Sequence, residues 1–227
     1  MGTLYVVGTP IGNLEDVSPR TRRVLGEVSV VAAEDTRRTR ALLTHLEMSK
    51  PLIAVYADVE RDRAAQVVDA LDRGDVAYCT DAGMPVVSDP GAFVVDTARA
   101  AGHEVVVIPG PSAVVAAIAG SGFRGDRFRF LGFLPRKSAQ MTALFEELLD
   151  CRDTAVAFEA PHRLSKALDI ISATLPDRRC AVARELTKVH EEFQVGLAAE
   201  LSAHYRERPA KGEITLVVEG ASRRKRA

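Results

Sequence analysis

The first half of the chain alternates short apolar segments with stretches of helical periodicity, and this alternation restricts the fold more than any other feature. The apolar segments span residues 3–8, 28–33, 51–56, 76–80 and 104–108. They lack a polar residue at every second position, as strands covered on both faces do. Helical spacing follows at residues 36–46, 59–73 and 92–101, and Ser18-Pro19 resembles a helix start. This order predicts a parallel sheet.

The second half predicts a different kind of sheet. Its predicted strands span residues 127–134, 154–158, 179–184, 190–195 and 213–219, and its predicted helices span residues 138–149, 163–174 and 197–206. The strands that meet near residues 184 and 190 are close enough in sequence to pair antiparallel, so we expect a mixed sheet. The Gly-rich polar segment 120–126 predicts a boundary. We therefore expect an N-terminal αβ domain over residues 1–120, a C-terminal αβ domain over residues 121–222 and a basic tail over residues 223–227.

Composition excludes several classes of protein. With 227 residues, 47% of them hydrophobic, the chain is long and apolar enough for a globular fold. The formal net charge of −1 means that any contact with nucleic acid has to come from local basic patches. The three cysteines have no metal-ligand spacing, so we expect no metal and reduced thiols. No secretory leader or membrane span is indicated, and a cytoplasmic protein is expected.

Three loops rich in glycine and proline follow the first, fourth and fifth predicted strands. They span residues 8–13, 81–91 and 109–113. Glycine lets a backbone approach a ligand closely and proline fixes the shape of a loop. Any one of these loops is equally typical of an ordinary turn. Because ligands of open parallel sheets bind at the carboxyl ends of the strands, three such loops at one edge predict a binding site.

The first loop lacks the glycine spacing of phosphate-binding motifs. Neither G-x-G-x-x-G nor G-x-x-x-x-G-K-[ST] occurs there, although Glu34-Asp35 lies near the position of a ribose-binding acid. A ligand without phosphates, such as S-adenosylmethionine, therefore fits better than a dinucleotide. A nucleotide-dependent oxidoreductase is a distant alternative.

Charged residues of the second half occur in tight groups beside predicted strands. The groups lie at residues 159–163, 184–188, 190–192 and 211–213. Each group alone is typical of a solvated turn, and His162 also suits a helix N-terminus. Several strands deliver Arg, Lys, His and Glu to one region, however, and this pattern predicts a catalytic cleft.

Taken in order, these motifs resemble the tetrapyrrole methylase superfamily, and within it the bacterial enzymes that methylate the ribose 2′-oxygen of a cytidine in 16S rRNA. The resemblance extends over nearly the whole chain and rests on residues 4–14, 33–37, 80–85, 88–91, 109–113, 159–163, 184–188 and 211–213. Relatives that act on porphyrinoids have a more glycine-rich first loop that ends in aspartate. Here that loop reads Gly-Thr-Pro-Ile-Gly-Asn, which favours the RNA branch.

The resemblance implies a two-domain α/β fold with an N-terminal parallel sheet and a C-terminal mixed sheet. It also implies a homodimer, with the cofactor S-adenosylmethionine bound in the cleft between the domains. The cofactor-binding residues that it implies are Thr9, Pro10, Asp81, Ala82, Gly83, Met84, Ser88, Gly110, Pro111, Ser112, Ala113, Phe158, Leu164 and Gly212.

In the implied reaction a ribose hydroxyl attacks the sulfonium methyl, so a base or a neighbouring cation should assist the loss of the proton. The sequence does not choose among Glu159, His162, Glu185, Lys188 and Glu213. Lys188 acts as a base only if burial lowers its pKa. The expected phosphate contacts to 16S rRNA in the small ribosomal subunit are Arg136, Lys137, Arg163 and Arg184, of which the first two equally suit a solvated loop.

Two alternatives to the rRNA methyltransferase stay open. The first is a porphyrinoid C-methyltransferase of the same superfamily, which would share the fold and the cofactor. The second is an RNA-binding assembly factor without turnover. It is kept because family members usually continue beyond the last strand into a small C-terminal appendage, whereas this chain stops at Ala227.

Overall fold

The computed structural model describes residues 1–222 and divides the chain into two compact units. The first unit spans Met1–Ser112 and the second begins at Ala113. The basic tail predicted at residues 223–227 lies outside the described residues.

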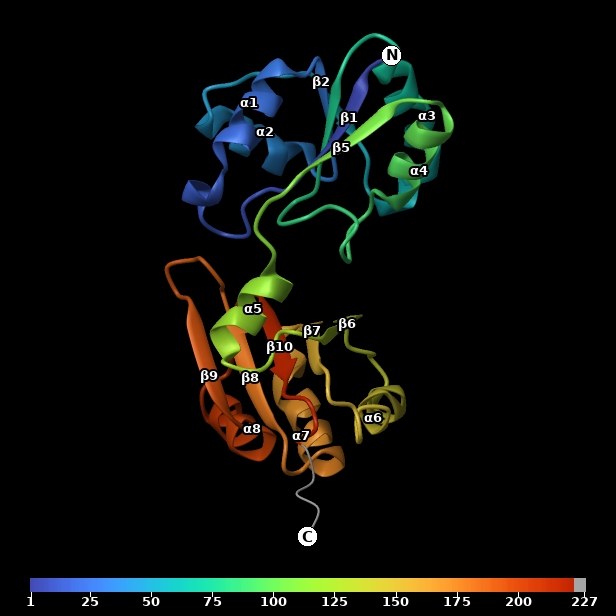
Figure 1. The fold of residues 1–227 in the computed structure, drawn as a ribbon. Coiled ribbons are helices and arrows are strands. Elements are labelled where there is room, and N and C mark those ends of the chain that lie inside the picture. The colour runs from blue at the N-terminus through green and yellow to red at the C-terminus, as the bar shows by residue number, and fades with distance from the viewer. Residues whose placement is uncertain (223–227) are drawn as a thin grey trace. The chain divides into compact units, whose positions relative to one another are not determined.

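The first unit contains a five-stranded sheet in which all strands run parallel (Figure 1). The strand order is β3-β2-β4-β1-β5. The strands are β1 (Thr3–Val7), β2 (Val30–Ala33), β3 (Leu52–Ala54), β4 (Val76–Cys79) and β5 (Glu104–Ile108). The predicted parallel sheet is therefore confirmed, with strands that are equal to or shorter than the apolar segments that predicted them.

Helices cover both faces of the first sheet, which explains its continuous apolar runs. On one face, α1 (Pro19–Glu27) and α2 (Thr36–His45) pack with the core around Val7, Val31 and Cys79. On the other face, α3 (Glu60–Leu71) and α4 (Ala92–Ala100) pack around Leu4 and Tyr78 (Figure 1). Two short 3₁₀ helices, η1 (Leu14–Asp16) and η2 (Ala57–Val59), lie in the connections.

The start of α1 confirms the expected helix cap. The Ser18 side chain accepts a hydrogen bond from the Thr21 backbone N–H at 3.0 Å, and Pro19 occupies the first turn. This satisfies one of the amide groups that a helix N-terminus leaves without a partner.

The second unit contains a mixed five-stranded sheet, as predicted, in the order β6-β7-β10-β8-β9. Strands β6 and β7 run parallel, whereas β10 pairs antiparallel with both β7 and β8, and β8 pairs antiparallel with β9. The strands are β6 (Phe128–Phe133), β7 (Thr154–Glu159), β8 (Arg179–Arg184), β9 (Glu192–Leu197) and β10 (Ile214–Val218).

Helix α5 (Ala113–Ser121) belongs to the second unit because it packs against strands β7 to β10. The opposite face of that sheet is covered by α6 (Ser138–Glu146), α7 (Leu164–Thr174) and α8 (Ala198–Glu207), whose buried side chains form one apolar core with the strands. The 3₁₀ helix η3 (Pro161–Arg163) leads into α7. The two units thus divide at Ser112, before α5, whereas the Gly-rich segment at residues 120–126, where we expected the boundary, begins with the last two residues of that helix.

Candidate functional site

The three loops predicted to build a site follow β4, β1 and β5, which are neighbours in the first sheet. Because these strands are parallel, their carboxyl ends, and the loops after them, share one edge. The arrangement is the one from which ligand binding is expected in an open α/β sheet.

Direct contacts join the three loops. Thr9 and Gly83 exchange two backbone hydrogen bonds, at 2.9 and 3.1 Å, and form an isolated antiparallel bridge. The Gly110 backbone N–H points at the Met84 sulfur at 3.3 Å. These contacts hold the loop after β1 between the loops after β4 and β5.

Gly8 and Gly110 touch backbone to backbone, and this contact requires glycine at both positions. A Cβ on Gly8 would lie 2.6 Å from the Gly110 nitrogen and 2.7 Å from the Met84 sulfur. A Cβ on Gly110 would lie 2.7 Å from the Gly8 carbonyl carbon. Close backbone approach is therefore the local reason for the glycines in the first and third loops.

The loop after β4 has an unusual backbone. Val86 and Ser88 have φ values of 77° and 64° without being glycine. A β-branched residue rarely adopts this left-handed region, and residues held in this way concentrate at functional sites. Val86 is also exposed, so packing of its side chain does not explain its conformation.

Carboxylates connect the loop after β4 with the loop after β2. The Asp35 backbone N–H donates to Asp81 Oδ1 at 3.1 Å, and the Asp81 backbone N–H donates to Glu34 Oε2 at 3.2 Å. Arg38 Nε lies 3.5 Å from Asp81 Oδ2. Burial raises the pKa of Glu34, and the hydrogen bond from the Asp81 backbone N–H opposes this rise. Asp81, predicted to bind the cofactor, thus has an evident role in holding these loops and Arg38.

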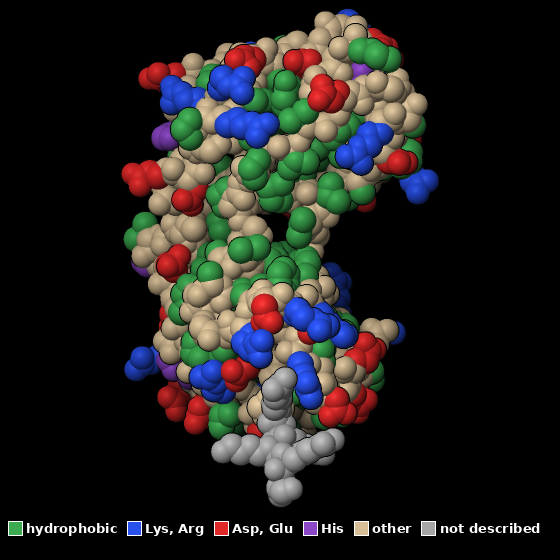
Figure 2. Space-filling view, viewed as in Figure 1, with side chains coloured by type: hydrophobic (Ala, Val, Ile, Leu, Met, Phe, Trp, Pro, Cys, Tyr) green, Lys and Arg blue, Asp and Glu red, His purple; other side chains and the backbone are tan. Residues whose placement is uncertain are grey.

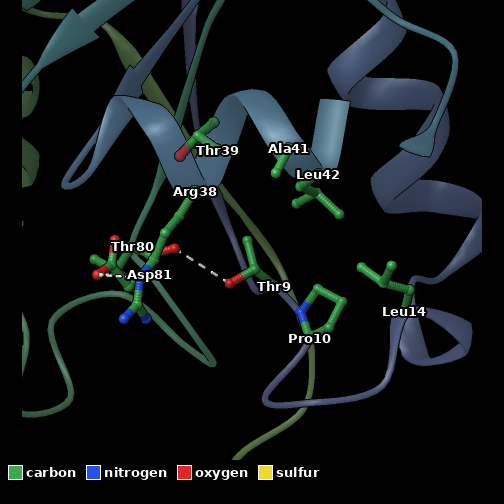
Figure 3. Close-up of a pocket in the computed structure, with 9 residues that line it drawn as sticks. All are labelled: Thr9, Pro10, Leu14, Arg38, Thr39, Ala41, Leu42, Thr80 and Asp81. Atoms are coloured by element: carbon green, nitrogen blue, oxygen red, sulfur yellow. Dashed lines mark hydrogen bonds and ion pairs between the residues drawn. The ribbon is translucent and has the colours of Figure 1, made fainter. Parts of the chain in front are cut away.

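A pocket of about 240 Å³ opens between α2 and the loops after β1 and β4 (Figure 3). We refer to it as the α2 pocket; it is lined by Thr9, Pro10, Leu14, Arg38, Thr39, Ala41, Leu42, Thr80 and Asp81. Thr9, Pro10 and Asp81 were predicted site residues, and the others were missed. The available signal was Arg38 with Ala41 and Leu42 at helical spacing, but it did not indicate which loop these side chains face.

In the second unit, strand register brings the predicted charged groups to one edge of the sheet. Ile214, at the start of β10, pairs with Glu159 at the end of β7 and with Arg184 at the end of β8. Arg184 also pairs with Glu192 at the start of β9. The prediction that several strands deliver charged residues to one region is confirmed for this edge.

Glu185, Lys188 and Glu213 form a connected cluster at this edge. Lys188 Nζ lies 2.8 Å from Glu185 Oε1 and 3.0 Å from Glu213 Oε2, and the Glu213 backbone N–H donates to Glu185 Oε1 at 2.9 Å. A Cβ on Gly212 would lie 2.3 Å from the Glu185 Cδ atom. Gly212 therefore keeps space for the carboxylate that holds Lys188.

The electrostatics of the cluster correct one expectation. Burial alone lowers the pKa of Lys188, but hydrogen bonds to the two glutamates outweigh burial and the pKa is raised. The hydrogen bond from Lys188 lowers the pKa of Glu185. The lowered pKa that Lys188 would need to act as a base is therefore not found, and Lys188 is suited to act as a cation.

Glu159 and Arg163 form a mostly buried pair. Glu159 is 3% exposed, its Oε1 accepts a hydrogen bond from the Ala160 backbone N–H at 2.7 Å, and its Oε2 lies 3.2 Å from Arg163 Nη2. Burial raises the pKa of Glu159. The hydrogen bond from Ala160 and the charge of Arg163 lower it, but burial has the larger effect. Arg163 also donates to the carbonyls of Leu134 and Pro135. Both residues hold the chain entering α7.

The remaining predicted residues of the second unit differ in accessibility. His162, Arg136 and Lys137 are exposed, whereas Arg184 pairs with Glu192 at 2.7 Å. Leu164 is fully buried in the core, so only its backbone is available to a ligand. Phe158 packs between the rings of Phe130 and Phe133. Within residues 1–222, no cluster of metal ligands occurs and no helix is long and apolar enough to cross a bilayer.

Comparison with known proteins decides the family. Residues 3–202 match the family model of the tetrapyrrole (corrin/porphyrin) methylases. The chain belongs to this family. Among solved structures, this family member resembles the methyltransferase CobJ, with a TM-score of 0.73 at 18% identity over 100% of this chain and 98% of that one. A diphthine synthase gives a TM-score of 0.71 at 13% identity, over 96% and 90% of the two chains. These two likenesses show the shared fold.

Curated relatives are more similar in sequence. The chain is 43% identical to a protein of Thermotoga maritima named ribosomal RNA small subunit methyltransferase I, over 97% of this chain and 99% of that relative. It is 42% identical to a protein of the same name from Halalkalibacterium halodurans, over 96% of this chain and 76% of that relative. Because the Thermotoga maritima relative is matched over almost its whole length, the expected C-terminal appendage is not a general feature of these relatives.

Proposed function

We propose that this chain transfers a methyl group from S-adenosylmethionine to the ribose 2′-hydroxyl of a cytidine in the 16S rRNA of the small ribosomal subunit. The observation that carries the proposal is the 43% identity, over 97% of the chain, to a relative named as a small-subunit rRNA methyltransferase. The choice of the 2′-oxygen and of a cytidine rests on the motif resemblance described above.

The edge of the first sheet fits S-adenosylmethionine. The Gly8–Gly110 contact leaves no space for side chains, so the loops there meet through their backbones. This suits a ligand without phosphates. In the proposal the cofactor is held by Thr9, Pro10, Ser88 and the segments 81–84 and 110–113, and by Phe158, the backbone of Leu164 and Gly212.

When bound, the cofactor supplies a methyl group on a positively charged sulfur, which is a good leaving group. The protein has to orient the hydroxyl, which can contribute about 7–11 kcal/mol, and to remove its proton. We assign the removal of the hydroxyl proton to the Lys188–Glu213 pair. The Lys188 ammonium group favours the ionised form of a nearby hydroxyl, and the exposed Glu213 carboxylate, 3.0 Å from Lys188 Nζ, accepts the proton.

The other three candidate groups have different roles in this proposal. Glu185 positions Lys188 through their 2.8 Å contact. Glu159 is too buried to reach a ribose and positions the turn at Ala160. His162 is exposed and has no partner among the described residues that would orient it, so it is the second choice as proton acceptor.

The decisive experiment maps the methylated nucleotide after small ribosomal subunits are incubated with the protein and labelled S-adenosylmethionine. We expect one labelled cytidine that resists alkaline cleavage, as a 2′-O-methylated residue does. Transfer to a porphyrin precursor instead would support the porphyrinoid C-methyltransferase, which the description of the family favours. RNA binding without cofactor binding would support an assembly factor. The homodimer, the placement of the cofactor between the domains and the cytoplasmic location stay predictions.

A further inference from the structure

The α2 pocket is small. Its volume is about 240 Å³, below the range of about 300–1,000 Å³ for sites that take drug-sized ligands. A single flat group such as one nucleobase is the kind of ligand that a pocket of this size suits.

The walls of the α2 pocket combine flat apolar surface with a few polar groups. Pro10 and Leu14 form one wall, and Ala41 and Leu42 of α2 form the facing wall (Figure 3). The polar groups of the lining include the buried Thr80 hydroxyl, next to Asp89, and the Asp81 carboxylate. Aromatic bases present apolar faces and hydrogen-bonding edges, and this lining suits both.

The helix that borders the α2 pocket is basic. Helix α2 carries Arg37, Arg38 and Arg40 and no acidic residue. The Arg37 and Arg38 side chains are 88% and 62% exposed, and Arg37 donates to both carboxylate oxygens of Asp35, at 3.1 and 2.7 Å. Helix α1 adds exposed arginines, and Figure 2 shows Lys and Arg side chains gathered over the part of the first unit that α1 and α2 form.

Arg38 is held at the rim of the α2 pocket by Asp81. Its Nε lies 3.5 Å from Asp81 Oδ2 (Figure 3). Asp81 is itself fixed by the Asp35 backbone N–H, which donates to its Oδ1. At this distance the pairing is loose, and most of the guanidinium group stays open to solvent. Arg38 can therefore contact a phosphate next to the pocket while Asp81 limits its orientation.

We propose that the α2 pocket receives one unstacked base of the substrate RNA, and that Arg37, Arg38 and Arg40 bind the phosphates beside it. This inference rests on the proposed function, because it takes RNA as the substrate. Thr9, Pro10 and Asp81 line this pocket and also belong to the proposed cofactor site, so the base would lie beside the cofactor. Next to the arginines of α2, charge favours RNA over the cofactor. S-adenosylmethionine carries a sulfonium and an ammonium group against one carboxylate, so arginines repel it, whereas they attract the phosphates of RNA.

The first test fills the α2 pocket without changing any charge. Ala41 lines the pocket and is exposed on α2, so Ala41→Phe should fold normally. We expect about tenfold weaker binding of a short fluorescein-labelled single-stranded RNA, which is about the contribution of one stacked base. Fluorescence anisotropy measures this binding. The dependence of binding on salt should stay unchanged, because no phosphate contact is lost.

The second test removes one phosphate contact. Arg38→Ala should weaken binding of the same RNA several-fold and reduce the slope of its salt dependence by about one. Arg63→Ala is the matched control, since Arg63 is an exposed arginine on α3, which packs on the opposite face of the sheet. The control should bind RNA as the wild type does. An equal loss of RNA binding in both variants would overturn the assignment of phosphate contacts to α2.

Calorimetry with S-adenosylmethionine separates this inference from the proposed function. Both variants should bind the cofactor within about twofold of the wild type. Loss of cofactor binding in Ala41→Phe would assign the α2 pocket to the cofactor, and normal RNA binding by that folded variant would also overturn the inference. If the wild type transfers no methyl group to small ribosomal subunits, the proposed function fails, and the anisotropy result still decides the role of the pocket.

Discussion

The edge of the first sheet that carries the candidate site is built mainly from backbone, whereas the charged edge of the second sheet is built from side chains. At the first edge, Gly8, Gly83 and Gly110 bring loops into direct contact. At the second edge, Glu185, Lys188 and Glu213 form hydrogen-bonded ion pairs. The two units therefore offer different chemistry: one offers loop backbone held in a fixed shape, and the other offers charges that can stabilise or accept a proton.

This difference indicates that the first edge binds a ligand and the second edge takes part in proton transfer. Backbone groups bind a ligand without titrating, so their binding should vary little with pH. Charged side chains change with pH and can take part in proton transfer. Substitutions at the first edge should therefore remove cofactor binding, and substitutions in the charged cluster of the second edge, Glu185, Lys188 and Glu213, should lower turnover with cofactor binding kept.

The largest effect is expected from Gly8→Ala. The new Cβ would lie 2.6 Å from the Gly110 nitrogen and 2.7 Å from its Cα, so two backbone segments would have to separate. We expect binding of S-adenosylmethionine to fall below detection by calorimetry. The free energy of unfolding, measured with urea, should fall by about 1–3 kcal/mol.

One glycine outside the site controls for this result, and a second glycine within the site repeats the test. Gly26→Ala lies in α1, where the new Cβ would meet only the flexible Met48 side chain at 3.4 Å, and it should leave cofactor binding intact and stabilise the helix by about 0.5–1 kcal/mol. Gly83→Ala has space for a Cβ, but φ +80° strains any side chain there. It should fold even if Gly8→Ala does not, and it should still weaken cofactor binding. Normal cofactor binding by both Gly8→Ala and Gly83→Ala would contradict a site made of backbone.

The next effect concerns Lys188→Met, which removes the charge and keeps most of the side-chain volume. Since Lys188 contacts both Glu185 and Glu213, its loss should lower kcat about 10²–10⁴-fold. Cofactor affinity should stay within about twofold. Labelled-methyl transfer to small ribosomal subunits and calorimetry measure the two quantities. Lys166→Met, an exposed lysine on α7, is the control. A matching loss of cofactor affinity would place Lys188 in the cofactor site and remove the distinction between the two edges.

The first edge could be predicted from sequence because its geometry follows from local order. In β-α-β units the strands are parallel, so the loops at residues 8–13 and 81–91 had to share an edge once the strands were recognised. The same reasoning did not predict the α2 pocket. Arg38 and Pro10 meet only through packing of α2 against the loop after β1, and helical periodicity alone does not indicate which loop a helix faces.

For the second edge, the sequence predicted which types of residue lie there but not which side chains contact each other. That Lys188 meets Glu213 depends on the antiparallel register in which Ile214 pairs with Arg184, and a shift of one residue would separate them. The position of helix α5 could not be predicted from sequence either. It is apolar on all sides, so its sequence does not say which sheet it covers, and only its packing on β10 assigns it to the second unit.

A smaller effect, at the second edge, is a pH dependence of stability. Burial raises the pKa of Glu159 above its ordinary value of 4.5. The folded state therefore binds this proton more tightly than the unfolded state, so stability from this group is complete below pH 4.5 and is lost as the pH rises through the folded-state pKa. Glu159→Gln should remove this loss, because an amide oxygen can still accept the Ala160 N–H.

Urea unfolding of wild type and Glu159→Gln on both sides of pH 4.5 measures the difference. The variant should gain stability relative to wild type as the pH rises. Glu207→Gln, at an exposed glutamate of α8, should show no such trend. A wild type that becomes more stable relative to Glu159→Gln over the same range would mean that the pairing with Arg163 dominates over burial.

The smallest expected effect tests whether the loop after β4 is strained for binding. Val86 has φ +77°, and a left-handed conformation costs an L-residue about 1–2 kcal/mol, whereas glycine in the unfolded chain costs about 0.5–1 kcal/mol in entropy. Val86→Gly should therefore stabilise the fold by less than about 1 kcal/mol, since these two effects oppose each other. It should also weaken cofactor binding several-fold, because the loop would no longer be held in one shape.

Val87→Gly provides the control. Val87 is 43% exposed and Val86 is 42% exposed, but the φ of Val87 is not positive. The Val87→Gly substitution should therefore only destabilise the fold. If both variants lose stability equally, the conformation of Val86 stores no strain, and the rigidity of the first edge has to come from the contacts of Gly8, Gly83 and Gly110 alone.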